Sequence, residues 1–257
     1  MAIEQLRLLS PLYLLALSCF FLPVTIVNLL TSFQLAKLIS WSTLQDAWFG
    51  RFWAFFGPRV RETAAGHVEP LVQAARGVVL DVGPGSGQWL YLYSPQRNTN
   101  ITKVYGVEPN LEHHPALRRA IRREGLDGIY EIIGVGAEAL RTQGILPASV
   151  DTIVTVQVLC SVPKPRLLVK ELYSYLKPGG QWIVYEHVRT KFTHEFVSSW
   201  QVLVDRVWPI CFGGCSITRP TDEYLIAAGP WASIHLRPGV DEHKYDTVPH
   251  AMGYLRK

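Results

Sequence analysis

The stretch from Val78 to Leu90, VVLDVGPGSGQWL, constrains the fold of this chain more than any other segment. Its first five residues are mostly apolar and β-branched, as in a buried parallel strand. The loop that follows, GPGSG, lets the backbone turn sharply against a ligand because glycine has no Cβ. Such a strand delivers its loop to the carboxyl edge of an open α/β sheet, where nucleotide-like ligands bind. We therefore expect an α/β fold organised around this loop.

The spacing of the glycines indicates which nucleotide-like ligand the loop binds. A dinucleotide fingerprint is Gly-x-Gly-x-x-Gly, whereas this loop is Gly-x-Gly-x-Gly with Gln88 after it. That spacing, with an aspartate just ahead of it, favours S-adenosylmethionine over NAD. A glycine-rich turn without a ligand is the alternative. The residues assigned to the cofactor here are Asp81, Gly83, Gly85 and Gly87.

A second strand, Lys103 to Val107, ends at Glu108, and this carboxylate lies 21 residues beyond Gly87 (108 − 87 = 21). An acidic side chain at the tip of the second strand can accept hydrogen bonds from both ribose hydroxyls of a nucleoside. We expect Glu108, followed by Pro109, to bind the cofactor rather than to be a surface carboxylate.

The carboxyl ends of the later strands supply further candidates. A third strand, 129–133, is followed by small residues that leave room for a flat ring, so Ala137 and Glu138 are expected to flank adenine. Cys160 follows the fourth strand, 150–158, at the edge where the transferable methyl group belongs. It either contacts the donor or is a small buried thiol.

The order of the remaining elements predicts a doubly wound sheet. We expect helices at 88–95, 117–124 and 165–176, the last ended by Lys177-Pro178-Gly179-Gly180, and a fifth strand at 181–185. Five βα units with short turns and right-handed crossovers give a mostly parallel sheet. The late segments 233–236 and 251–255 are expected to pair as an antiparallel hairpin at one edge.

The amino-terminal segment predicts membrane attachment. No charged residue occurs from Leu8 to Ala36, a run long enough to cross a bilayer. Pro11 and Pro23 leave two alternatives open, a single span or a hairpin within one leaflet. A signal anchor fits better than a cleaved signal peptide. The cations that follow the run outnumber the one before it, which predicts a cytosolic soluble domain.

Residues 41–61 mix seven Trp and Phe side chains with arginines. This composition is typical of a helix at the headgroup region, or of one that packs over the active site. Because the expected core strands all begin after Arg76, we expect residues 1–36 to hold the protein on membranes while the fold remains intact without them.

Charge and cysteine spacing exclude other classes of function. The formal net charge is +4, and the cluster Arg118, Arg119, Arg122 and Arg123 has no interleaved aromatic residues. We therefore expect a solvated helix face and no nucleic-acid partner. The four cysteines form no CxxC motif and no HExxH motif is present. Cys211 and Cys215 could pair or bind a metal, but we expect ordinary reduced cysteines and no metal site.

The segments LDVGPGSG, GVEPN, VLCSV, LKPGGQW and YEHV, in this order, resemble class I S-adenosylmethionine-dependent methyltransferases. More narrowly, VLCSV, EHV, WQVLVDRVW, GGCSITR and VPHAMGYLRK resemble the membrane-anchored methyltransferase-like family that includes microsomal alkyl thiol methyltransferases. The resemblance implies a Rossmann-like seven-stranded sheet with a reversed carboxyl-terminal hairpin, and a location on endoplasmic reticulum or lipid droplets. Pro84, Glu108 and Gly213 depart from the family's more usual residues, which leaves the substrate open.

Three parts are therefore expected: a membrane anchor at 1–40, an interfacial or cap helix at 41–66, and a methyltransferase domain at 67–257. The expected reaction transfers a methyl group to sulfur or oxygen of a lipophilic small molecule. The alternatives are a quinone or phospholipid methyltransferase and a catalytically silent scaffold. His187 is the candidate general base, because its usual pKa lies near neutrality. Asp205 could orient His187 or a polar group of the substrate, or could be a helix salt bridge.

Overall fold

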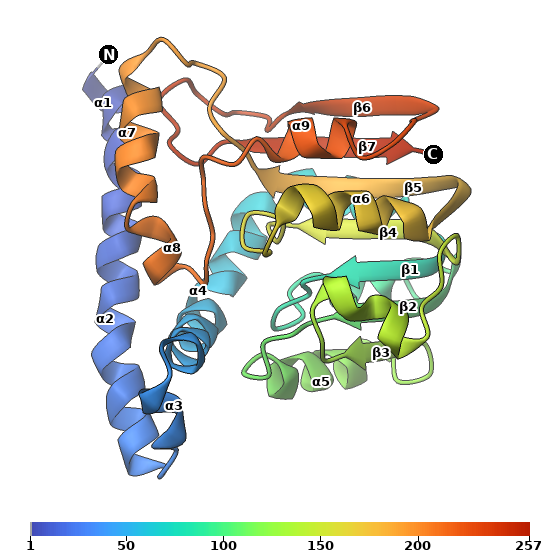
Figure 1. Ribbon diagram of the computed structural model, residues 1–257, viewed down its shortest axis with the longest axis horizontal. Helices are drawn as coiled ribbons and strands as arrows, with labels where there is room; N and C mark the ends of the chain where they lie inside the picture. The colour runs from blue at the N-terminus through green and yellow to red at the C-terminus, as the bar shows by residue number, and fades with distance from the viewer. Residues whose placement is uncertain (1) are drawn as a thin grey trace.

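The computed structural model describes residues 2–257; Met1, the first residue of the predicted anchor, lies outside this range. Its centre is one sheet of seven strands in the order β3-β2-β1-β4-β5-β7-β6 (Figure 1). The strands are β1 Gly77–Val82, β2 Ile101–Val107, β3 Tyr130–Ile133, β4 Val150–Val156, β5 Leu176–His187, β6 Ser233–Pro238 and β7 His250–Arg256. The predicted Rossmann-like, mostly parallel seven-stranded sheet is confirmed.

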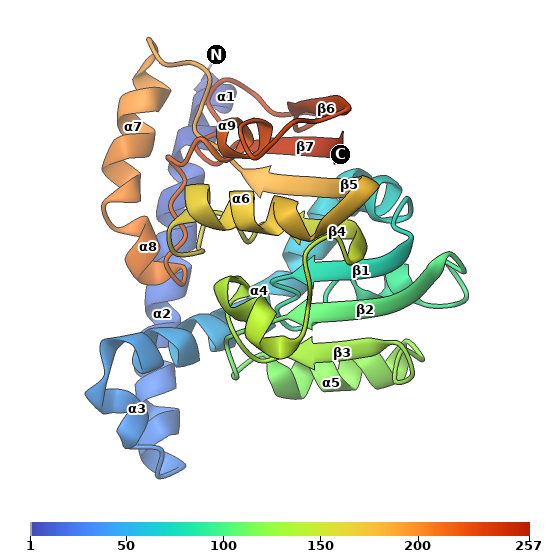
Figure 2. The same ribbon diagram turned by 45° about the vertical axis from the view of Figure 1, so that its right-hand side comes forward.

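The chain order of the strands reverses on either side of β1, because β2 pairs with one edge of β1 and β4 with the other, both parallel. This is the switch point at which α/β sheets bind nucleotides. Among the seven described strands, β7 runs opposite to the others: it is antiparallel to both β5 and β6. The arrowheads of β1, β4 and β5 point toward the long helix at the amino terminus (Figure 2). The carboxyl edge of the sheet therefore faces that helix.

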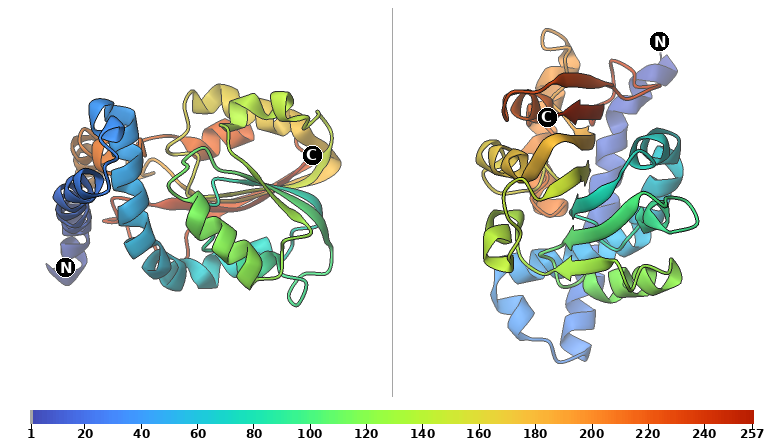
Figure 3. Two further views of the ribbon diagram at one scale, coloured as in Figure 1. Left: turned by 90° about the horizontal axis from the view of Figure 1, so that it is seen from below. Right: turned by 90° about the vertical axis from the view of Figure 1, so that its right-hand side faces the viewer.

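Helices cover both faces of the sheet (Figure 3). One face packs against α6 Pro165–Tyr175, α9 Thr221–Ile226 and the 3-10 helix η3 Ala137–Gln143. The other face packs against α5 His114–Arg123, the 3-10 helix η2 Leu90–Tyr93 and the second half of α4 Trp41–Val72. The α4 helix continues past residue 66, the expected end of the cap helix. Ala64, Val68 and Val72 in its second half belong to this core.

Two local predictions are wrong. The helix expected at 88–95 is only the single turn η2, which ends because Pro95 forces Ser94 into an extended conformation, with ψ of 143°. The α6 helix does stop before 177–180, at Tyr175, but this segment is the first part of β5, which begins at Leu176 and not at Gln181. The backbone N–H of Gly179 donates to the carbonyl of Lys257 at 2.8 Å, so the far end of the chain pairs with this segment.

The amino terminus forms α1 Ala2–Gln5, the 3-10 helix η1 Leu6–Leu9, α2 Ser10–Thr31 and α3 Ala36–Ile39. The α2 helix is continuous through Pro23, so the structure contains a single apolar helix and not a hairpin broken at that residue. The segment Leu6–Thr31 spans 26 residues and contains an 18-residue stretch with a mean hydropathy of 2.1, so by length and composition alone it could cross a membrane.

The α2 helix is docked along the domain that contains the sheet. It lies beside α7 Phe196–Asp205 and α8 Trp208–Cys211 at the carboxyl edge of the sheet (Figures 1 and 2). The hydroxyl of Ser18 donates to the carbonyl of Cys211 at 2.8 Å, and the Trp48 indole N–H donates to the carbonyl of Ser18 at 2.7 Å. A third apolar core, separate from the two sheet faces, fills the space between α2, α4 and α8.

Candidate active site

A cavity of about 1210 Å³ lies at the carboxyl ends of β1, β2, β4 and β5. Its walls come from the glycine loop after β1, from both halves of α4, and from the loops after β4 and α8. Ser10 and Leu14 show that α2 also contributes to the wall. The cavity thus runs from the switch point of the sheet toward the apolar helix.

The glycine loop needs its glycines for two reasons. Gly83, Gly85 and Gly87 have φ values of +69°, +56° and +83°, which L side chains rarely adopt. A Cβ on Gly83 would also lie 2.3 Å from Cγ2 of Val158, and a Cβ on Gly87 would lie 2.8 Å from that of Ala120. Gly87 therefore packs the loop on α5, while Gly83 and Gly85 line the cavity.

Glu108 lies buried at the tip of β2 and lines the same cavity. Its Oε2 accepts the backbone N–H of Gly85 at 2.9 Å, and its Oε1 accepts that of Asn110 at 2.9 Å. Burial raises the pKa of this carboxyl to about 7, although the two backbone donors lower it. Each oxygen keeps a lone pair for a further donor.

The other residues predicted for the cofactor fall into two groups. Pro109, Ala137, Glu138 and Cys160 line the cavity with Glu108. Asp81 lies beneath the loop, where its carboxylate accepts the Tyr130 hydroxyl at 2.9 Å. Burial raises the pKa of Asp81 to about 7. Asp81 thus supports the strand end from below.

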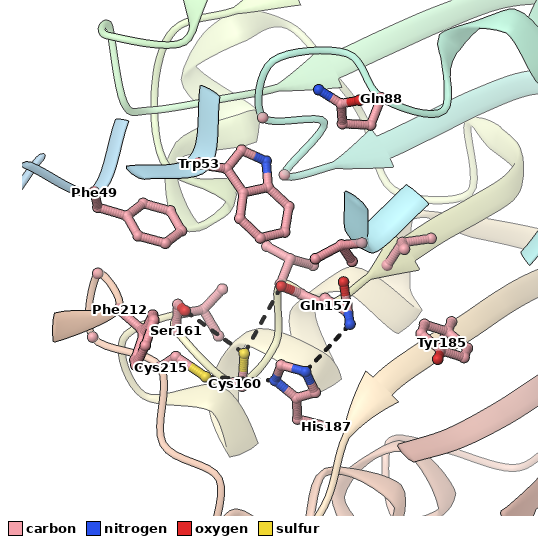
Figure 4. Close-up of a pocket in the computed structure, with 18 of the residues that line it drawn as sticks. Phe49, Trp53, Gln88, Gln157, Cys160, Ser161, Tyr185, His187, Phe212 and Cys215 are labelled. Carbon is pink, nitrogen blue, oxygen red and sulfur yellow. Dashed lines mark hydrogen bonds between the residues drawn. The ribbon is translucent and has the colours of Figure 1, made fainter. Parts of the chain in front are cut away.

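At the opposite side of the cavity three side chains from separate segments meet (Figure 4). Cys160 follows β4, His187 ends β5, and Cys215 lies in the loop after α8. One sulfur or ring-nitrogen atom from each lies within 4.8 Å of the other two. Sγ of Cys215 and Nδ1 of His187 are 3.5 Å apart.

The second ring nitrogen of His187 faces a polar network. Its Nε2 is 3.3 Å from the Gln157 side-chain amide, which is 3.1 Å from Nε2 of His250. Nδ1 of His250 is 2.6 Å from Oε1 of Glu242. Gln157 has a φ of +55°, an uncommon backbone conformation that clusters at functional sites.

Asp205 lies outside this cluster and holds a loop. Its carboxylate accepts the hydroxyls of Ser216 and Thr218 at 2.8 and 2.6 Å and the backbone N–H of Ile217 at 2.7 Å. This loop directly follows Cys215. The hydrogen bonds of Asp205 in the described residues therefore position the loop, and none reaches His187.

Aromatic side chains form the wall between the two ends of the cavity. Trp53 stacks on Phe49 with ring centroids 5.8 Å apart, and Phe52 meets Phe212 edge-on at 5.3 Å. Trp53 lies between the glycine loop and the cluster of Cys160, His187 and Cys215 (Figure 4). Apolar walls with a few polar groups are typical of small-molecule sites.

A model of the methyltransferase domain family matches residues 56–218, more than half of the chain. The chain belongs to this methyltransferase family. A curated relative, thiol S-methyltransferase TMT1A from Homo sapiens, is 25% identical over 226 residues, which cover 84% of this chain and 89% of the relative. Phosphatidylethanolamine N-methyltransferase from Cereibacter sphaeroides is 27% identical over 129 residues, 50% of this chain and 60% of the relative.

Among solved structures, an O-methyltransferase family protein from Burkholderia thailandensis superposes with a TM-score of 0.60 at 13% identity, covering 92% of this chain and 71% of that one. This likeness shows the fold. Together with the family match, it identifies the chain as an S-adenosylmethionine-dependent methyltransferase. The predicted enzyme class is confirmed.

The structure also brings in Gln157 and Glu242, which the sequence did not single out. Cys215 and His250 appeared there only within the stretches GGCSITR and VPHAMGYLRK, with no role beside His187 assigned to them. The four residues follow β4, α8 and β6 in the chain. They meet because β7 pairs with β5, a partner that the local sequence pattern does not specify.

Proposed function

We propose that this methyltransferase transfers the methyl group of S-adenosylmethionine to the sulfur of a lipophilic thiol at a membrane surface. The observation that carries the proposal is the single cavity that joins the glycine loop and Glu108 to an aromatic wall and the cluster of Cys160, His187 and Cys215. The relative TMT1A, whose name states thiol S-methylation, supports the choice of sulfur over oxygen.

The donor fits the end of the cavity next to β1 and β2. Gly83 and Gly85 leave room for its methionine part, because neither residue carries a Cβ. Glu108 is placed to accept hydrogen bonds from the ribose hydroxyls with the lone pairs left on its two oxygens. Ala137 and Glu138, after β3, would flank the adenine.

Methyl transfer from a sulfonium is an in-line displacement by a donor that is already activated. The acceptor sulfur attacks the methyl carbon, and the electron pair of the broken carbon–sulfur bond stays on the donor sulfur. The protein must align the two sulfurs and remove the thiol proton. His187 stands closest to this requirement, since it lines the cavity and is the one imidazole in the cluster.

The exposed side chains of α2 fit a helix that lies in the plane of the membrane surface and attaches the protein there. The side chains of Tyr13, Phe20 and Val27 on α2 are exposed, as are Val202, Leu203 and Val207 beside or within α7. These helices lie together at one end of the molecule (Figure 1). An apolar surface of this kind inserts into the headgroup and acyl boundary. An apolar thiol dissolved in the membrane would then lie next to the cavity wall formed by Leu14.

We place this surface on the cytosolic leaflet of the endoplasmic reticulum or of lipid droplets. Lys37, Arg51, Arg59 and Arg61 follow the apolar helix, against Arg7 before it. Cations beside a helix that lies in the interface are attracted to the anionic cytosolic leaflet, so they support a cytosolic catalytic domain. Fluorescence microscopy of the tagged full-length chain, with protease protection of the domain, tests both parts of the assignment.

The test of the reaction uses purified full-length protein in detergent, S-adenosylmethionine and octanethiol. Mass spectrometry should detect octyl methyl sulfide, while octanol of the same chain length should remain unmethylated. Binding of S-adenosylmethionine without turnover of any thiol, alcohol or lipid would leave only the scaffold interpretation.

A phospholipid acceptor is the second candidate, because one relative is a phosphatidylethanolamine N-methyltransferase and α2 would hold the cavity at a lipid surface. Vesicles of phosphatidylethanolamine supplied in place of octanethiol distinguish the two. Methylated headgroups would favour this candidate over the thiol.

A further inference from the structure

We propose that Cys160, His187 and Cys215 form a site for a zinc ion, and that its fourth position binds the acceptor thiol as a thiolate. The proposal deepens the proposed function and rests on it. It names the group that deprotonates and holds the acceptor sulfur beside the donor methyl.

The distances fit tetrahedral zinc. Zinc lies about 2.3 Å from a thiolate sulfur and about 2.0–2.1 Å from a histidine nitrogen, which places two sulfurs roughly 3.8 Å apart and sulfur and nitrogen roughly 3.6 Å apart. Sγ of Cys215 and Nδ1 of His187 are 3.5 Å apart, and all three pairs of ligand atoms lie within 4.8 Å. Small rotamer changes therefore suffice for coordination.

The chemistry of the ligands also fits zinc. Two thiolates and one imidazole form a mixed sulfur and nitrogen ligand set. Such a set binds zinc in preference to calcium or magnesium, which take oxygen ligands. Three protein ligands with an open fourth position are the pattern of catalytic zinc, whereas structural zinc has four. All three ligands line the cavity that contains the glycine loop, so an open position would face the donor.

The loops that carry the two cysteines are fixed in place. The buried carboxylate of Glu186 accepts the backbone N–H groups of Val158 and Leu159 at 3.1 and 3.0 Å. Arg219 donates to the carbonyls of Leu159 and Val162 at 2.9 and 2.7 Å. Cys160 therefore lies in a segment whose backbone is held by hydrogen bonds to Glu186 and Arg219. Such outer contacts are what a metal site needs to keep its ligands oriented.

The second cysteine loop is tied to the first. The backbone N–H of Ser216 donates to the carbonyl of Cys160 at 2.9 Å, and Asp205 holds the residues that follow. Asp205 therefore acts as a positioning residue for Cys215 in this proposal.

His187 has a partner for the ring nitrogen that would not bind the metal. With Nδ1 on zinc, Nε2 carries the proton and faces the amide of Gln157 at 3.3 Å. Turning that amide by 180° presents its oxygen to the N–H. A metal-bound histidine almost always donates its other N–H in this way. As a free base, by contrast, His187 would have to break its contact with either Cys215 or Gln157.

The reaction balances without any redox change. The acceptor thiol binds zinc as a thiolate and releases its proton to solvent. The thiolate sulfur forms a bond to the methyl carbon while the donor's sulfonium–carbon bond breaks and its electron pair stays on the donor sulfur. Both products are neutral thioethers, which are weaker ligands than thiolates, so the product can leave.

Cobalt is the probe for the test, because tetrahedral cobalt with thiolate ligands gives strong visible bands. Full-length protein in detergent, reduced and stripped with a chelator, should bind one Co²⁺ per chain with these bands, and Zn²⁺ should displace it. Adding octanethiol should shift the bands by filling the fourth position. Cys160→Ser, Cys215→Ser and His187→Gln should each weaken Zn²⁺ binding by at least the roughly 10- to 100-fold that loss of an outer hydrogen-bond partner of a ligand costs.

The other two cysteines supply a matched control. Cys19 and Cys211 lie outside the cluster, so the double variant Cys19→Ser/Cys211→Ser should keep the bands and the stoichiometry. Absence of tetrahedral bands in the wild-type protein, bands that persist in Cys160→Ser/Cys215→Ser, bands that ignore octanethiol, or a Cys160–Cys215 disulfide in place of metal binding would each overturn the proposal.

The two proposals fail in different ways. If stripped protein methylates octanethiol as fast as zinc-loaded protein, the zinc proposal is wrong and the proposed function stands. If the protein binds zinc at these three residues but methylates no thiol, the metal site stands and the proposed function is wrong.

Discussion

Glu108 is held in its binding geometry by the protein itself. Its two oxygens accept the backbone N–H groups of Gly85 and Asn110, which link the glycine loop to the tip of β2. The carboxylate therefore needs no rearrangement to meet two hydroxyl groups. This prior order is a reason to expect a large effect from its removal.

Glu108→Ala should weaken binding of S-adenosylmethionine by roughly 1.5 to 3 kcal/mol, the range for hydrogen bonds to a charged group. Isothermal titration calorimetry on the full-length protein measures the change. Asp127→Ala, which removes an exposed carboxylate after α5, is the control and should bind as the wild type does. Unchanged affinity in Glu108→Ala would remove this residue from the donor site.

The pH dependence of donor binding should report the same carboxyl. Burial raises the pKa of Glu108 to about 7 in the donor-free protein. The carboxylate accepts two hydroxyls better than the neutral acid does, so affinity should be highest above pH 7 and should fall as the pH drops below it. Glu108→Gln cannot titrate and should show a flat profile in calorimetry from pH 6 to pH 8. A wild-type profile as flat as that of Glu108→Gln would contradict the assignment.

His187→Ala should lower turnover of a thiol by roughly 100-fold or more, whether His187 removes the thiol proton itself or binds the zinc ion that does, and should leave donor affinity nearly unchanged. Both residues line the same cavity, and in the proposed function His187 acts on the acceptor and Glu108 on the donor, so the two effects should separate. Steady-state kinetics and calorimetry on the same preparation test this. The matched control is His194→Ala, an exposed histidine before α7. The defect should shrink as the pH rises through the pKa of the acceptor thiol, because less help is then needed to form the thiolate.

At the scale of elements, the sequence predicted the parts of the fold that have a strong local pattern. The strands β1 to β4 and the helix α6 follow from apolar runs bounded by glycine or proline, and the switch point follows from their order. The turn at η2 was missed because its apolar residues suggest a helix until Pro95 is considered. The first part of β5 was missed because its partner, Lys257, lies at the other end of the chain.

The candidate site divides in the same way. Its donor end comes from a contiguous motif and from Glu108 at a predictable strand tip. The acceptor end comes from loops after β4, β5, α8 and β6, which meet only in the folded chain. The expectation of no metal site used local cysteine spacing, and such spacing cannot reveal Cys160 and Cys215, which lie 55 residues apart (215 − 160 = 55).

Asp205→Ala tests the loop between α8 and α9 as an element. The substitution removes the acceptor of three hydrogen bonds from residues 216–218 and should lower the free energy of unfolding by roughly 1.5 to 3 kcal/mol. Turnover should fall as well, because Cys215 loses its fixed position, while donor affinity should be retained. Thermal unfolding and kinetics measure the two effects. Asp205→Asn keeps one acceptor oxygen and should be affected less; equal turnover in both variants and the wild type would mean that this loop has no part in catalysis.

At the scale of the whole molecule, the apolar helix is part of the fold. Trp48 and Phe52, exposed by 2% and 1%, pack in the core that α2 helps to cover. A chain shortened to begin near Trp41 would expose these side chains to water and leave the Trp48 indole N–H without its acceptor on Ser18. The structure therefore changes the expectation that the fold is intact without residues 1–36.

The same docking sets the orientation at the membrane. A helix that spanned the bilayer would have to leave α8 and the indole of Trp200, which donates to the carbonyl of Leu8 at 2.8 Å. Arg7 also pairs with Asp246 at 2.9 Å, at the amino-terminal end of the helix. These contacts favour a helix that lies in the plane of the interface, with its outer face in lipid.

Phe20→Lys/Val27→Lys should therefore release the protein from vesicles without unfolding it. Both side chains are exposed on α2, by 65% and 58%, so two charges there disfavour insertion into lipid but disturb no core packing. Co-sedimentation with phosphatidylcholine vesicles measures binding, and thermal unfolding checks the fold. Leu146→Lys, a substitution at an equally exposed leucine in the loop before β4, should keep full binding. Because the cavity would no longer lie beside the membrane, the released variant should also methylate vesicle-dissolved octanethiol more slowly than wild type, yet at the wild-type rate in detergent. Retention of the double variant on vesicles would contradict the in-plane orientation.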